Sequence, residues 1–163
     1  MPRVVLYQPQ IPPNTGNVAR TCAATGTALH LVEPLGFEIS DRTLKRAGLD
    51  YWPWVPLQRH LNWAAFLQQQ QPAGGRLLAL SRHANCSYLD CRFREDDWLV
   101  FGRETDGLPS DVLAQCDQRL TIPMRCSSDR PEGGVRSLNL SVSVGIVLFE
   151  ALRQLGHLSE GSQ

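Results

Sequence analysis

Short apolar segments alternate along this chain with longer segments in which apolar residues recur every three or four positions. The short segments are rich in Val, Leu and aromatic residues, which predicts strands. They cover residues 3–8, 28–34, 54–58, 76–81, 97–102 and 119–124. The alternation predicts an α/β domain with a largely parallel sheet over residues 1–156, followed by a tail at 157–163.

Helical periodicity and capping residues predict the helices between these strands. Asn14 or Thr15 is expected to cap the first helix and Gly26 to end it, while Ser40 and Ser110 are expected to cap two short helices. The predicted helices cover residues 14–25, 40–48, 62–71, 110–116 and 137–156.

The final predicted helix is apolar on almost every side. One face carries Leu138, Val142, Ile146, Phe149 and Leu152, and another carries Leu140, Val144, Val147, Leu148 and Leu155. A surface helix normally has one apolar stripe, so one face is expected to cover the sheet and the other to pack against a second subunit. The alternative is complete burial within one monomeric core.

The overall charge does not predict a globally basic nucleic-acid-binding protein, because 16 basic and 16 acidic residues balance. No apolar run reaches the length of a membrane span, and the first residues do not resemble an export signal. The five cysteines form no C-x-x-C pair, which favours reduced thiols over a zinc site. A cytoplasmic protein that binds no metal and no membrane is therefore expected.

Polar, Gly-rich segments follow several of the predicted strands, where α/β proteins place their ligands. They are "PPNTGNVAR" (12–20), "ALSRH" (79–83), "FGRETDGLP" (101–109) and "IPMRCSSDRPEGGVRSLNLS" (122–141). Each segment alone is more typical of a helix cap or a turn than of a binding site. The G-x-G-x-x-G, P-loop, H-E-x-x-H and G-x-S-x-G patterns do not occur.

Taken together, these segments resemble a known family. "NTGNVAR", "FGRETDGLP" and "IPM" followed by "RSLNLSVSVG" are similar, in order and approximate spacing, to the three motifs of the SPOUT-class RNA 2′-O-methyltransferases. The opening "VVLYQPQIPPNTGNVARTCAATG" and the later "LHLVEPLGF" and "LKRAGLDYW" resemble the single-domain TrmL (YibK-like) subgroup, which methylates the wobble nucleotide of tRNA. The resemblance extends from about residue 3 to residue 156.

The resemblance implies a SPOUT-type parallel sheet with helices on both faces and a C-terminal trefoil knot. It also implies a homodimer with S-adenosylmethionine bound in the knot loops, at residues that match the family's donor site. These are Leu80, Gly102, Ile122, Ser137 and Leu138. Three of them could enclose an adenine ring with apolar side chains, and Gly102 could let the ligand approach the main chain.

The family motif places Arg20 at the reacting ribose. A guanidinium stays protonated in proteins, so Arg20 is expected to bind the target phosphate or stabilise the developing alkoxide rather than to act as a base. Asn14 is expected to hold Arg20 or the ribose, and Glu104 or a substrate phosphate to accept the proton.

Substrate contacts are predicted from charge and from the resemblance. Arg42, Lys45 and Arg46 share one face of the helix predicted at 40–48, which is either solvated or grips RNA phosphates. The resemblance implies methylation of C or modified U at the tRNA wobble position, with leucine tRNA as the expected substrate. The alternatives are another RNA site, or a non-catalytic RNA-binding homodimer.

Overall fold

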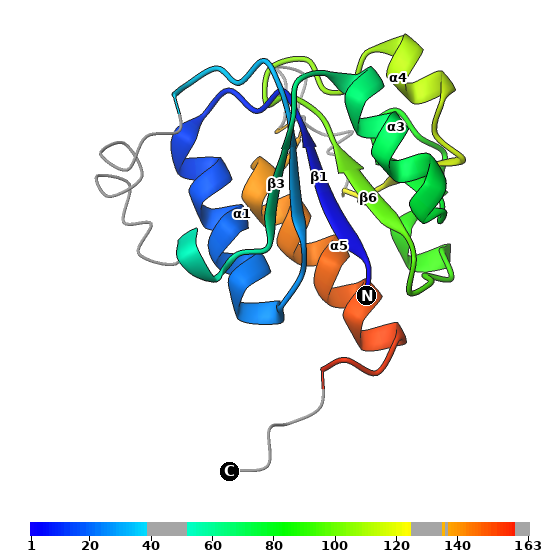
Figure 1. Ribbon diagram of the computed structural model, residues 1–163. Coiled ribbons are helices and arrows are strands. Elements are labelled where there is room, and N and C mark those ends of the chain that lie inside the picture. The colour runs from blue at the N-terminus through cyan, green and yellow to red at the C-terminus, as the bar shows by residue number, and fades with distance from the viewer. Residues whose placement is uncertain (39–51, 125–134, 136, 159–163) are drawn as a thin grey trace.

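The computed structural model describes residues 1–38, 52–124, 135 and 137–158, which form an α/β fold (Figure 1). Within these residues, seven strands make one parallel sheet in the order β3-β2-β1-β6-β4-β7-β5. The strands are β1 (Arg3–Tyr7), β2 (Leu29–Val32), β3 (Leu57–His60), β4 (Leu77–Leu80), β5 (Cys86–Ser87), β6 (Trp98–Phe101) and β7 (Gln118–Thr121). The predicted parallel sheet is confirmed.

Helices cover both faces of this sheet, as predicted (Figure 1). They are α1 (Pro12–Thr25), α3 (Trp63–Ala73), α4 (Ser110–Ala114) and α5 (Leu140–Gln154), with short 3-10 turns η1 (Trp52–Trp54) and η2 (Tyr88–Asp90). Strand β1 explains the two layers, because its side chains alternate between faces. Val4 and Leu6 join the core beneath α1 and α5, whereas Val5 and Tyr7 join the core beneath α3 and α4.

Two predicted helix caps were wrong. Helix α1 begins at Pro12 rather than at an Asn14 or Thr15 cap, and its N-cap residue, Ile11, makes no side-chain capping bond. Two prolines fit the first turn because amides there have no partner within the helix. Ser110 is the first residue of α4 rather than its cap.

The strand predicted at 54–58 also differs from the structure. Residues Trp52–Trp54 form η1, and β3 begins only at Leu57. Pro53 and Pro56 lack amide hydrogens, so this segment cannot support a continuous ladder of strand hydrogen bonds. The helix predicted at 40–48 lies outside the described residues. The two-residue strand β5 was missed, because so short a segment has no periodicity to detect.

Helix α5 is shorter than predicted, and its two faces differ in burial. It begins at Leu140 because the Asn139 side chain caps it, accepting a 2.8 Å hydrogen bond from the Ser141 amide. The face that covers the sheet is the one with Leu140, Val144, Val147 and Leu148, all of which are buried. Leu152 was assigned to the wrong face, since it is also buried, whereas Leu138, Val142 and Phe149 are exposed.

The amino ends of β4 and β6 are joined by a partly buried ion pair between Arg76 and Asp97. The Asp97 carboxylate is fully buried and accepts hydrogen bonds from Arg76 Nε and Nη2 (2.9 and 2.8 Å) and from the Arg94 amide (2.7 Å). Its hydrogen bond raises the pKa of Arg76. Asp117 closes the same end by accepting a 2.7 Å bond from the Leu77 amide. This end of the sheet therefore has its buried polar groups satisfied.

A histidine pair lies within the α3 side of the core. His30 Nδ1 and His60 Nε2 are 2.9 Å apart, and the two rings stack. Phe66 and Trp98 contact the His30 ring edge-on. Burial, followed by the nearby His60 charge, lowers the pKa of His30 to about 4, so the pair is uncharged at neutral pH.

No helix in the described ranges combines the length and apolar character that a membrane crossing requires.

Candidate active site

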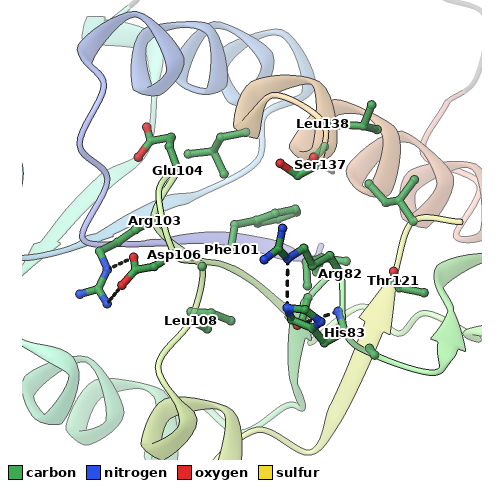
Figure 2. Close-up of a pocket in the computed structure, with 18 of the residues that line it drawn as sticks. Arg82, His83, Phe101, Arg103, Glu104, Asp106, Leu108, Thr121, Ser137 and Leu138 are labelled. Atoms are coloured by element: carbon green, nitrogen blue, oxygen red, sulfur yellow. Dashed lines mark hydrogen bonds and ion pairs between the residues drawn. The ribbon is translucent and has the colours of Figure 1, made fainter. Parts of the chain in front are cut away.

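A cavity of about 500 Å³ lies beyond the carboxyl ends of β4, β6 and β7 (Figure 2). These three strands are neighbours in the sheet, so the loops that follow them meet. Residues 80–84 and 101–108 line the cavity, together with Thr121, Ile122 and Met124, residues 137–140 at the start of α5 and Asn14 on α1. The parallel sheet thus brings together all four polar segments noted in the sequence.

Seven of the predicted site residues line this cavity. They are Asn14, Leu80, Gly102, Glu104, Ile122, Ser137 and Leu138. Arg20 does not line it and is exposed on α1. Arg42, Lys45 and Arg46 lie outside the described residues.

The Glu104 carboxylate binds the start of α1. Its Oε2 accepts a hydrogen bond from the Gln10 amide (2.9 Å), and its Oε1 accepts from the Ile11 amide (3.1 Å) and from Asn14 Nδ2 (3.3 Å). Figure 2 shows Glu104 pointing toward the blue ribbon that leads into α1. A negative charge is favourable at a helix N-terminus, so Glu104 supplies the cap that α1 lacks in its own sequence.

Asn14 extends this contact to the third motif. While its amide nitrogen donates to Glu104, its Oδ1 accepts a 2.9 Å hydrogen bond from Asn139 Nδ2. Asn139 in turn caps α5 through the Ser141 amide. A continuous chain of hydrogen bonds therefore connects "NTGN", "GRETDG" and "RSLNLS", which are far apart in sequence, along one wall of the cavity.

The segment between Arg103 and Gly107 forms a tight turn. The two residues exchange backbone hydrogen bonds of 3.1 and 3.0 Å, and Gly107 has a φ of 75°. Arg103 Nε and Nη2 bind the two Asp106 oxygens at 2.6 and 2.7 Å, which lowers the pKa of Asp106 and raises that of Arg103. Arg103 Nη1 also donates to Gln8 Oε1 at 2.8 Å. Arg103 and Asp106 therefore hold the loop in place.

Gly102 is required by this turn. A Cβ atom at residue 102 would lie 2.2 Å from the Gly107 carbonyl carbon and 2.4 Å from the Leu108 nitrogen. Both are backbone atoms that cannot rotate away. The sequence predicted that a ligand approaches the main chain closely at Gly102. In the structure, the backbone of Gly107 and Leu108 makes the close approach.

The cavity has the size and lining expected of a nucleoside-sized ligand. Its volume lies within the range of about 300–1,000 Å³ that is typical of small-molecule sites. Leu80, Ile122 and Leu138 supply apolar side chains, and Ser137 and Thr121 supply hydroxyl groups. This lining fits the adenosine portion of S-adenosylmethionine. Among the described residues, no group of three or more His, Cys, Asp or Glu side chains could hold a metal ion.

Asn139, Arg82 and His83 also line the cavity, and although they lie within the noted segments 122–141 and 79–83, no individual role was predicted for them. Asn139 was detectable as a capping residue before an apolar helix, but its second contact, to Asn14, depends on the tertiary fold. Arg82 and His83 lie in the turn after the apolar strand β4, a position that favours a role in ligand binding.

Comparisons with known proteins agree with this geometry. The SpoU rRNA Methylase family matches residues 1–149. A tRNA (cytidine(34)-2′-O)-methyltransferase from Polaromonas sp. is 50% identical over 155 residues, which cover 94% of this chain and 90% of the relative.

Two solved structures share the fold. One, described as "Structural insights into the 2-OH methylation of C/U34 on tRNA", has a TM-score of 0.85 and 53% identity, covering 96% of this chain and 97% of that chain. The other is the SpoU methyltransferase AviRb from Streptomyces viridochromogenes in complex with the cofactor AdoMet. It has a TM-score of 0.78 and 25% identity, covering 95% of this chain and 60% of that chain.

Proposed function

The chain belongs to the SpoU rRNA methylase family, and we propose that it transfers a methyl group from S-adenosylmethionine to the ribose 2′-oxygen of nucleotide 34 of tRNA. One observation carries this proposal: the hydrogen-bonded connection of Asn14, Glu104 and Asn139 along one cavity. The relatives named for methylation at this nucleotide support the choice of substrate.

The cavity residues are assigned to the methyl donor. Leu80, Ile122 and Leu138 would enclose the adenine ring, while main-chain groups near Gly102 and Ser137 would contact its polar edge. S-adenosylmethionine, when bound, supplies a methyl group made electrophilic by the positive charge on sulfur. Calorimetry tests this assignment, since Leu138→Asp should weaken donor binding and unchanged affinity would contradict it.

The chain's own residues would contribute mainly by positioning. Holding both reactants in place can lower a barrier by roughly 7–11 kcal/mol in favourable cases. The two oxygens of Glu104 already accept three hydrogen bonds from residues 10, 11 and 14. This geometry favours a role in fixing Asn14 and the loop 102–108, and it leaves a substrate phosphate as the favoured proton acceptor.

We assign Arg20 to the cavity of a second subunit. Arg20 is exposed on α1 and does not line the cavity of its own chain. Helix α1 packs against α5, whose exposed Val142 and Phe149 leave an apolar surface available to a second copy. Mixing Arg20→Ala chains with chains mutated in the cavity tests this arrangement: restored activity in the mixed dimer would support it, and its absence would contradict it.

We also propose that the segment before α5 passes through an earlier loop as a trefoil knot. Strand β7 lies next to the edge strand β5, yet α5 contacts the central strand β6 and helix α1. This separation of β7 from α5 supports the proposed knot. Electron density that traces residues 122–139 would test the path.

The function is tested with total RNA from cells that lack the gene. Purified protein and S-adenosylmethionine should restore a ribose methyl group at nucleotide 34, with leucine tRNA as the expected substrate. Mapping of 2′-O-methylation by mass spectrometry identifies the nucleotide. Methylation at another RNA position would contradict the substrate assignment, and donor-independent RNA binding alone would contradict the activity.

A further inference from the structure

Arg82 and His83 occupy a hydrogen-bonded turn directly after β4. The Ala84 amide donates to the Ser81 carbonyl (3.2 Å), and the His83 amide donates to Ser81 Oγ (3.3 Å). Both Arg82 and His83 line the cavity, and Figure 2 shows the Arg82 guanidinium directed toward the region between Phe101 and Ser137. The turn therefore holds a positive charge at the cavity in a defined orientation.

His83 orients the Arg82 guanidinium. Arg82 Nε donates a 3.0 Å hydrogen bond to His83 Nε2, which requires the imidazole to carry its proton on Nδ1. This contact uses one donor of the guanidinium, and its two terminal nitrogens remain directed away from the histidine. Within the described ranges, no carboxylate forms an ion pair with Arg82.

The two carboxylates that line the cavity are already engaged. Glu104 is held by the start of α1, and Asp106 by Arg103. Arg119, which also lines the cavity, likewise has no carboxylate partner in the described part of the chain. The cavity is therefore locally positive in a chain whose formal net charge is zero. An anionic group is the ligand that such a surface favours.

We propose that Arg82, oriented by His83, binds the RNA phosphate adjacent to the target ribose. This inference rests on the proposed function. The 2′-oxygen and the 3′-phosphate are attached to neighbouring ribose carbons, so a site that accepts the 2′-hydroxyl must also accommodate a phosphate. A guanidinium with two free terminal nitrogens matches two phosphate oxygens.

The test is equilibrium binding of tRNA to Arg82→Gln protein over a series of salt concentrations. Arg94→Gln is the matched control, because it removes the same charge from an exposed residue at the amino end of the sheet. Arg82→Gln should weaken tRNA binding about tenfold. It should also reduce the slope of log K against log salt by about one, whereas Arg94→Gln should change neither quantity.

His83 is a positioning residue, and two variants test that role. His83→Leu removes the acceptor for Arg82 and should raise the KM for tRNA several-fold with little change in kcat. His83→Gln keeps an acceptor oxygen and should restore most of the lost affinity. Equal effects of the two substitutions would overturn the role assigned to His83.

Donor binding distinguishes a contact of Arg82 with an RNA phosphate from a contact of Arg82 with the carboxylate of the methyl donor. Calorimetry with S-adenosylmethionine should give the same Kd for wild-type and Arg82→Gln protein. A weaker donor Kd with unchanged tRNA binding would overturn the proposal and assign Arg82 to the donor carboxylate. A salt slope equal to that of Arg94→Gln would also overturn it. If wild-type protein binds tRNA without methylating it, the proposed function fails, while the binding comparison still decides whether Arg82 contacts phosphate.

Discussion

The two ends of the sheet use the same chemistry for different purposes. At the amino end, Asp97 accepts three hydrogen bonds from Arg76 and the Arg94 amide. At the carboxyl end, Glu104 accepts three from the Gln10 and Ile11 amides and Asn14. Asp97 is fully buried, whereas Glu104 is partly exposed and lines a cavity.

This difference determines what each carboxylate contributes. A buried charge with complete hydrogen bonding joins the strands around it, and removing one partner leaves the other uncompensated. A carboxylate beside a cavity loses less when it is replaced, because water can reach its former partners. We therefore expect the stability of the fold to depend on the amino end of the sheet. Ligand binding and catalysis should depend on the carboxyl end.

Asp97→Ala should produce the largest loss of stability. It leaves the Arg76 guanidinium partly buried without its carboxylate, so the free energy of unfolding should fall by about 3–5 kcal/mol. Urea denaturation monitored by circular dichroism measures this change. Asp96→Ala, next to it and exposed, is the control and should have little effect. A similar small loss for both variants would contradict the assigned role of the amino end.

Acid should destabilise the core beside the amino end through His30. Burial keeps the pKa of His30 at about 4, compared with 6.5 for an ordinary histidine, so the unfolded chain binds more protons between these values. The stabilisation that the uncharged His30 gives the folded state is complete above pH 6.5. As the pH falls toward 4, the free energy of unfolding should decrease by about 3 kcal/mol. Denaturation at several pH values should show this slope, and His30→Leu should reduce it. An unchanged slope in that variant would assign the acid sensitivity to other groups.

The architecture was readable from the sequence because each apolar strand is bounded by polar or Gly-containing turns. The order of the strands in the sheet could not be predicted, because it depends on how each helical connection crosses from one strand to the next. The first helix shows where local reasoning fails. Asn14 looked like its cap, but Glu104 from a distant loop takes that place and leaves Asn14 inside α1.

Part of the candidate site could be predicted, because some of its residues lie at the ends of recognisable strands. Leu80, Gly102 and Ile122 directly follow or end strands, so their shared position was visible in the sequence. The contact of Asn139 with Asn14 joins residues 125 positions apart and could not be seen locally. Arg82 lies within the noted segment 79–83, but it received no role of its own because a single charged residue after a strand has no distinguishing pattern.

Glu104→Gln should separate catalysis from stability at the carboxyl end. The amide keeps one acceptor oxygen but presents an NH2 group to a backbone donor, so the free energy of unfolding should fall by only about 1 kcal/mol. Displacement of Asn14 and the loop should lower kcat/KM by about tenfold to a hundredfold. Methyl transfer to tRNA and urea denaturation measure the two effects.

Glu95→Gln is the control for this variant, because Glu95 is an exposed carboxylate at the amino end, bound to the N-terminal amine and His157. It should leave kcat/KM unchanged. If Glu104→Gln instead lost stability as severely as Asp97→Ala while the folded fraction kept full activity, the contrast between the two ends would be wrong.

Phe149→Glu should have the smallest effect on the fold and still reduce activity. Phe149 is exposed on α5, the helix whose first turn borders the cavity, so a charge there changes no described core contact. If a second copy covers this face, a buried unpaired carboxylate would oppose association. Sedimentation velocity should show a shift from dimer to monomer, with unchanged circular dichroism and reduced methyl transfer.

Leu61→Glu, at another exposed apolar residue just past β3, should leave the dimer intact. If the Phe149→Glu protein remained dimeric and fully active, the cavity at the carboxyl end of the sheet would not depend on this face of α5.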